Sequence, residues 1–244
     1  MQLSSALDAR GVVCVVGAGG KKSTLYRLAG ELDRAVVTAT VRIPIFDDEV
    51  SRVLVEPDPV QAAASLRENA RWPIGVVSER EREDRYLGYD TGAIATLADS
   101  PAGAVLVKAD GARMRLFKAP DDREPQLPES AELVVPVASV RAVGQPLTEE
   151  AVHRPERVSA ITGLEIGDRI GAEDVARTLA SDRGGTKDVP EGARVVPIVN
   201  MVDDSTLERT AREVANEVLS GSAIDRVVLT RLIDEDPVIA VVER

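Results

Sequence analysis

The chain has 244 residues and a formal net charge of −11, because 41 acidic residues outnumber 30 basic ones. This acidic balance argues against nucleic acid and against an anionic membrane surface as partners. No stretch approaches the roughly 20 apolar residues of a membrane span, and no signal segment is visible, so we expect a cytoplasmic protein. The length suits a single α/β domain over residues 1–244. The one cysteine, Cys14, leaves no internal disulfide and is expected to be buried.

Short β-branched runs alternate with helix-like stretches along most of the chain. Strands are expected at 12–16, 35–40, 53–55, 73–77, 104–109, 132–138, 195–199, 226–229 and 238–242. Helices are expected at 23–32, 59–70, 155–161, 172–180 and 206–219. This alternation predicts an α/β fold with a mostly parallel sheet and helices on both faces.

Local signals indicate how two of these helices begin. Asp58 is placed to cap the second helix, and Pro59 suits its first turn. Ser205 and Glu208 have the spacing of a capping box at the start of the last helix. The charged stretch 78–85 is expected to be a solvated loop.

A glycine loop follows the first strand. Glycines let backbone N–H groups converge on an anion, the next helix adds its positive end, a lysine neutralises phosphate charge, and a hydroxyl can ligate Mg²⁺. We therefore predict a P-loop-like nucleotide-binding domain. The residues expected to hold the phosphates are Gly17, Ala18, Gly19, Gly20, Lys21, Lys22, Ser23 and Thr24.

The loop departs from the usual G-x-x-x-x-G-K-[ST] spacing in both possible registers. With Lys21 as the phosphate lysine, Lys22 occupies the hydroxyl position; with Lys22 in that role, Ser23 fits but Lys21 displaces the glycine. The register is therefore open. The dinucleotide fingerprint G-x-G-x-x-G fits less well, because its third glycine position holds Lys22. A Rossmann cofactor site is disfavoured.

Lysine is scarce, and arginine supplies most of the basic residues. A lysine retained in such a chain is expected where a compact point charge is needed. The five lysines are Lys21, Lys22, Lys108, Lys118 and Lys187.

Two other strand ends carry acid or hydroxyl groups. Asp110 follows the apolar run 104–107, where a Walker-B aspartate would hold Mg²⁺ directly or through water. The second strand ends in Thr38 and Thr40, either of which could meet a phosphate or metal or simply favour the strand. The only histidine, His153, has no neighbour that would mark it as catalytic.

Asn200 and Asp203 follow a later apolar strand with the N-x-x-D spacing of the guanine-recognising motif of GTPases. The aspartate of that motif accepts the N1 and N2 hydrogens of guanine. Met201 stands where the motif has lysine, which weakens the preference for guanine. An asparagine turn followed by a helix cap is the alternative.

These motifs together resemble the YqeC family, described as accessory proteins of selenium-dependent molybdenum hydroxylases. The chain departs from the family pattern at Lys22, at Lys108, where an acid is common, and at Met201. The resemblance is carried by V-G-A-G-G-K at 16–21, A-D-G-A at 109–112, K-A-P at 118–120, Glu124-Pro125, the strand entry at 130–135, G-Q-P-L at 144–147, H-R-P-E at 153–156, and Asn200 with Asp203.

The resemblance implies a nucleotide-binding protein that helps a molybdenum hydroxylase to mature, with that enzyme or its cofactor as partner. We expect Mg²⁺-dependent NTP hydrolysis, with GTP or ATP as the nucleotide. Lys21, Lys22 and Asp110 would be catalytic, and Ser23 and Asp110 would ligate the metal. Asn200 and Asp203 would face the base; Arg113, Lys118, His153 and Arg154 would line a substrate or partner surface.

Two other functions are compatible with the same residues. The first is a transferase that moves a nucleotidyl or phosphoryl group onto a small molecule such as the molybdenum cofactor. The second is a non-enzymatic carrier of a cofactor or a selenium species, which would use nucleotide only as a structural ligand.

Overall fold

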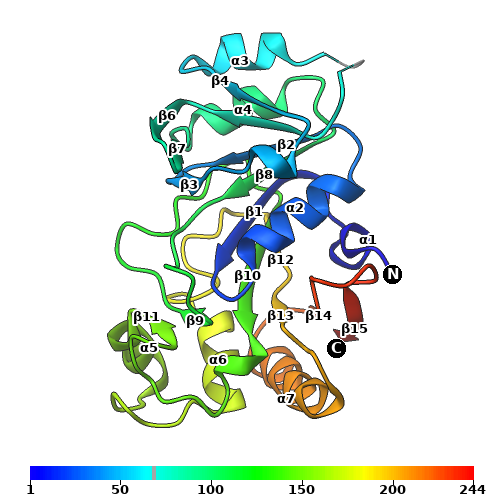
Figure 1. Cartoon of the computed structure of the whole chain (residues 1–244). Helices are drawn as coiled ribbons and strands as arrows, with labels where there is room; N and C mark the ends of the chain where they lie inside the picture. The colour runs from blue at the N-terminus through cyan, green and yellow to red at the C-terminus, as the bar shows by residue number, and fades with distance from the viewer. Residues whose placement is uncertain (68–69) are drawn as a thin grey trace.

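A central sheet forms the body of the protein in the computed structural model, which describes residues 1–67 and 70–244 (Figure 1). The strand order is β15-β14-β13-β10-β1-β8-β2-β5-β4, and β12 pairs with β10 beside β13. All described pairs in this sheet are parallel except β14 with β15. Its strands are β1 (Gly11–Gly17), β2 (Ala35–Ala39), β4 (Arg52–Val55), β5 (Ile74–Val77), β8 (Ala104–Lys108), β10 (Leu133–Ser139), β12 (Arg194–Val195), β13 (Ile198–Asn200), β14 (Arg226–Thr230) and β15 (Val238–Glu243).

Helices cover both faces of this sheet. One face packs against α1 (Leu3–Leu7) and α2 (Lys21–Glu31). The other face packs against α3 (Pro59–Ser65) and α4 (Ala93–Ala98) at one end, and against α6 (Ala172–Ala180) and α7 (Ser205–Gly221) at the other (Figure 1). The predicted α/β fold with a mostly parallel sheet is therefore confirmed.

The remaining elements are short. A second sheet contains β3 (Ile43–Pro44), β7 (Arg85–Leu87) and β6 (Glu79–Arg82), and a third pairs β9 (Phe117–Lys118) with β11 (Val152–His153). α5 (Pro155–Thr162) follows β11, and 3₁₀ turns lie at Asp47–Glu49 and Val140–Ala142. Within the described residues, no helix combines the length and apolar character needed to cross a membrane.

The strand β1 is buried on both faces, as its unbroken β-branched run predicts. Val13 and Val15 point into the core on the α2 side, and Cys14 and Val16 into the core on the α3 and α4 side. Burial raises the pKa of the Cys14 thiol, so this cysteine is a small apolar core residue.

The order in which the chain adds strands to the sheet switches from one side of β1 to the other. From β1 it crosses to β2 on one side and later returns as β8, between β1 and β2; it then continues on the other side with β10. In open parallel sheets, ligands bind beyond the carboxyl ends of the strands at such a switch point. The strands meeting there end at Gly17, Lys108 and Ser139.

Three local predictions were wrong. The last helix is capped by Asp204, which accepts the N–H groups of Thr206 and Leu207, so Ser205 is the first helical residue and no capping box forms. The charged stretch 78–85 forms most of the β6–β7 hairpin, whose charged side chains mostly face solvent. The strand expected at 195–199 is divided into β12 and β13.

The second helix begins as predicted and ends early. Asp58 accepts the N–H of Val60 at 2.9 Å, and Pro59 occupies the first turn. The helix ends at Ser65, and the part of the expected helix at 68–69 lies outside the described residues.

Candidate functional site

The glycine loop (residues 17–20) joins β1 to α2 in a conformation that requires glycine. The φ angles of Gly17, Gly19 and Gly20 are 91°, 78° and 146°. A Cβ atom on Gly17 would lie 2.2 Å from the Val137 carbonyl oxygen, closer than atoms can approach. Glycine is therefore required here both for the positive φ and for the close packing of the loop on β10.

The loop uses its first three amides within the protein. Gly17 N–H donates to Asp110 Oδ2 at 2.9 Å, Ala18 N–H to the Val137 carbonyl at 2.8 Å, and Gly19 N–H to the Arg115 carbonyl at 3.0 Å. These amides are not available to an anion. The backbone amides that remain available belong to the first turn of α2. The N–H groups of that turn have no carbonyl partner within the helix, and Gly20 has no side chain to cap them.

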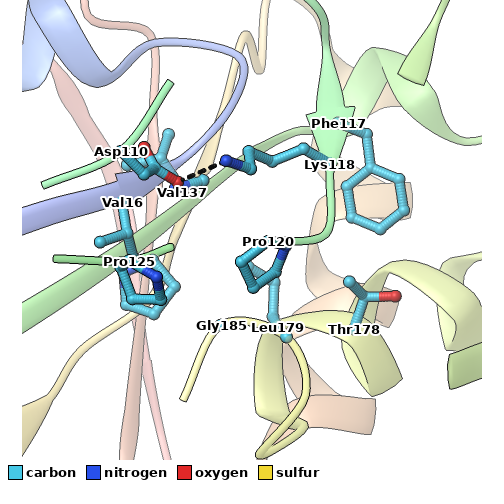
Figure 2. A pocket seen from close by; sticks show the side chains of 13 residues that line it. Val16, Asp110, Phe117, Lys118, Pro120, Pro125, Val137, Thr178, Leu179 and Gly185 are labelled. Carbon is cyan, nitrogen blue, oxygen red and sulfur yellow. Dashed lines mark hydrogen bonds and ion pairs between the residues drawn. The ribbon is translucent and has the colours of Figure 1, made fainter. Parts of the chain in front are cut away.

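A buried ion cluster lies behind the glycine loop, centred on Asp110. Its side chain is about 2% exposed, and its two oxygens lie 2.8 Å from Lys21 Nζ and 2.9 Å from Lys118 Nζ. Lys21 also donates to the Gly17 carbonyl. Burial alone would raise the pKa of Asp110, but the charges of Lys21 and Lys118 outweigh burial and hold it below its ordinary value. Figure 2 shows the Lys118 side chain extending from β9 toward Asp110.

Glu124 extends the cluster on the far side of Lys118. It lies 2.7 Å from Lys118 Nζ and 2.7 Å from Arg154, and it accepts the Gly111 N–H at 3.0 Å. Lys187 donates to the Glu124 backbone carbonyl at 2.8 Å. The cluster thus joins β8, β9 and the start of α5 through charge-assisted hydrogen bonds.

The residues expected to ligate Mg²⁺ differ in their surroundings, and the carboxylate among them already has partners within the protein. Both oxygens of Asp110 are held by lysines, and one also accepts an amide, whereas Ser23 is exposed on α2. Thr24 donates its hydroxyl to the Gly20 carbonyl at 3.1 Å. Among the described residues there is no group of three or more His, Cys, Asp or Glu side chains able to hold a metal ion.

A hollow of about 380 Å³ opens in front of the cluster, beside the first turn of α2. Its loop residues Arg113, Met114 and Met201 have positive φ angles of 45°, 62° and 64°, a strained conformation that is concentrated at functional sites. It is lined by cationic side chains, apolar side chains and the glycine loop: Ala18, Gly19, Gly20, Lys21, Lys22, Ser23, Arg42, Pro44, Arg85, Lys108, Gly111, Ala112, Arg113, Met114, Arg115, Leu116 and Met201.

The structure separates the two candidate phosphate lysines. Lys21 is 6% exposed and points to Asp110, while Lys22 is partly exposed and lines the hollow. Lys22 is therefore the lysine available to a ligand, and Lys21 belongs to the ion cluster.

Asn200 and Asp203 are occupied within the protein. Asn200 donates from Nδ2 to the Gly19 carbonyl at 2.8 Å, and its Oδ1 accepts the Thr230 hydroxyl at 3.0 Å. Asp203 pairs with Arg141 at 2.7 Å. Neither Asn200 nor Asp203 is among the residues that line the hollow. Asn200 thus holds the glycine loop against β13 and β14.

The remaining candidates have structural contacts. Thr40 donates to the Gln126 carbonyl at 2.6 Å, and Thr38 is fully buried in β2. His153 lies on β11 beside Lys118, where burial and the charge of Arg154 lower its pKa to about 4. The imidazole is therefore neutral at ordinary pH.

The comparisons with known proteins agree with the motif analysis. The YqeC protein family model matches residues 13–156. An uncharacterized protein YqeC of Escherichia coli strain K12 is 31% identical over 196 residues, which cover 78% of this chain and 75% of that protein. The chain belongs to the YqeC family. No solved structure matches it.

The YqeC family match includes most of the site. Residues 13–156 contain the glycine loop, Asp110, Lys118 and Glu124, but not Asn200 or Lys187. Sequence reasoning missed the contribution of Arg42, Arg85 and Lys108 to the hollow. The scarcity of lysine was the signal that could have indicated Lys108, because all five lysines contact the ion cluster or line the hollow.

Proposed function

We propose that this protein binds a nucleotide, with a phosphate group at the first turn of α2. The observation that carries the proposal is the set of open amides at that turn, beside Lys22 and at the switch point of the sheet. Amides with a positive helix end favour an anion, and Lys22 adds a full charge. The amides of Gly17, Ala18 and Gly19 take no part in binding this anion, because they donate to groups within the protein.

The apolar side of the hollow supports a nucleoside phosphate over inorganic phosphate. Met114, Leu116, Met201 and Pro44 line the same space as the cations. A methionine or leucine side chain packs well on the face of a heterocyclic base, whereas inorganic phosphate gains nothing from it. Because Asn200 and Asp203 are occupied elsewhere, we propose no preference for guanine.

The ion cluster favours the binding role over hydrolysis. Asp110 serves to neutralise Lys21 and Lys118, so we derive no magnesium-assisted step from it. Of the functions compatible with the sequence, the carrier or binding module fits this arrangement best. The part of the proposal concerning a molybdenum hydroxylase or its cofactor as partner rests on the family resemblance alone.

Calorimetric titration with AMP, ADP, ATP and GTP, in EDTA and in Mg²⁺, tests the proposal. We expect binding in both media, because the amides and Lys22 need no metal. Lys22→Ala should weaken binding roughly 10-fold or more, as the loss of a charge-assisted contact predicts. Arg209→Ala removes an exposed cation on α7 and should leave binding unchanged. Absence of binding for all four nucleotides, or binding only with Mg²⁺, would contradict it.

A further inference from the structure

Lys108 is a buried cation without a carboxylate partner. Its residue is 6% exposed, and its Nζ donates to two backbone carbonyls, those of Arg42 at 2.9 Å and Asp110 at 2.7 Å. Within the described part of the chain, no carboxylate lies within ion-pair distance of this Nζ. A buried ammonium held only by neutral groups is costly, so its retention in a lysine-poor chain calls for an anion that is not part of the protein.

The other lysines of the site differ from Lys108 in this respect. Lys21 and Lys118 share the carboxylate of Asp110, and Lys118 also contacts Glu124. Lys108 is the last residue of β8, the strand that Asp110 follows, and it lines the hollow. Its charge therefore acts on whatever occupies the hollow.

Two arginines line the hollow together with Lys108. Arg42 lies between β2 and β3, where it forms a bidentate pair with Glu81, and Arg85 on β7 lies 3.3 Å from Asp84. These pairs hold both arginines at the protein surface around the hollow. Arg42, Arg85 and Lys108 thus come from a different part of the fold than Lys22, which lies on α2.

The titration of Lys108 is set by its surroundings. Burial and the charges of Lys21 and Lys118 lower its pKa, while Asp110 and Glu124 act in the opposite direction, and the result is a pKa of about 8. Near neutral pH most Lys108 side chains carry a proton, and a bound anion would favour that protonated form further.

We propose that Lys108, with Arg42 and Arg85, forms a second anion subsite, so that the hollow accepts a ligand with two or more linked phosphates. The inference rests on the proposed function, because the first subsite is the turn of α2. It adds the ligand class: a nucleoside di- or triphosphate is preferred to a monophosphate.

The test compares AMP, ADP and ATP, together with inorganic phosphate and tripolyphosphate, by calorimetry in EDTA. For the native protein we expect ADP and ATP to bind at least about 10-fold more tightly than AMP. Lys108→Met should remove this advantage. Lys22→Ala, in contrast, should weaken all three nucleotides.

The pH dependence of nucleotide binding distinguishes the loss of the Lys108 charge from the loss of the folded structure. The advantage of ATP over AMP should fall as the pH rises from about 7 to about 9, as Lys108 loses its proton. Lys108→Arg keeps its charge and should retain the advantage at the higher pH. Circular dichroism of each variant checks that it is folded.

The results distinguish this inference from the proposed function. Equal binding of AMP, ADP and ATP to the native protein, or an unchanged preference for ATP in Lys108→Met, would overturn the second subsite and leave nucleotide binding intact. Binding of none of the nucleotides would overturn both. If tripolyphosphate binds as tightly as ATP, the second anion subsite is supported, but the proposal that the ligand is a nucleotide is contradicted.

Discussion

At the scale of single residues, Asp110 is the side chain on which most of the buried charge depends. It neutralises two lysines whose side chains are each 5% exposed or less, and it also accepts a hydrogen bond from the Gly17 amide. An acid at this strand end was predicted from the sequence. Its partners were not, because Lys118 is brought to Asp110 by the pairing of β9 with β11 and not by any local pattern.

Asp110→Asn should therefore destabilise the protein strongly. The substitution leaves Lys21 without a carboxylate and Lys118 with Glu124 alone, and removing one partner of a buried ion pair costs about 3–5 kcal/mol. The free energy of unfolding in urea measures the effect. Asp33→Asn is the control, because that side chain is 91% exposed and should change the free energy by less than about 0.5 kcal/mol. A similar small change for Asp110→Asn would remove Asp110 from this role.

The choice between Lys21 and Lys22 as the phosphate lysine is also decided by single residues. Two neighbouring lysines, Lys21 and Lys22, were equivalent in the sequence. The φ angle of 146° at Gly20 begins α2 so that Lys21 points inward, and its neighbour, 100° further around the helix, reaches the hollow. The sequence contains the glycine that permits this backbone conformation but not the conformation itself.

At the scale of the secondary-structure elements, Asn200 connects three of them. Its amide joins the end of β13 to the glycine loop and to Thr230 at the end of β14. The strands themselves could be predicted, because their β-branched runs are buried on both faces. The β6–β7 hairpin could not, because its strands are mostly charged and carry no apolar face to mark them.

Asn200→Ala should loosen the glycine loop. The Gly19 carbonyl and the Thr230 hydroxyl lose their partner, which predicts a loss of about 1–3 kcal/mol in the free energy of unfolding. Hydrogen exchange should become faster at the amides of Gly17 and Gly19, while the α7 amides are less affected. Asn216→Ala on the exposed face of α7 is the control. Unchanged exchange at the loop would mean that Asn200 does not hold it.

At the scale of the whole molecule, charge is distributed unevenly. The chain carries a formal charge of −11, yet cations gather around the hollow at one edge of the sheet. The composition predicts the acidic surface. The strand order that collects the five lysines at one place is a property of the complete sheet, and no local segment specifies it.

The ion cluster predicts an acid-sensitive fold. The folded-state pKa values of Asp110 and Glu124 lie below their ordinary values, so the stability they contribute is fully present above about pH 5. It should be lost as the pH falls through the lowered folded-state values, because both groups then take up protons. Urea unfolding of the native protein between about pH 7 and pH 3 measures this. Asp110→Asn should show a shallower decline, and an equally steep decline would assign the acid sensitivity to other groups.

The hydrogen bond between Asn200 and the Gly19 carbonyl bears on when the proposed binding site can form during synthesis. The two residues are separated by 181 positions, and Thr230 comes still later in the chain. During synthesis the glycine loop leaves the ribosome before β13 and β14, because Asn200 follows Gly19 by 181 positions. Contacts so distant along the chain form late, because closing a long loop costs entropy before any contact repays it. The proposed ligand site is therefore complete only after β13 and β14 have been made, and we expect a shorter nascent chain not to bind the ligand.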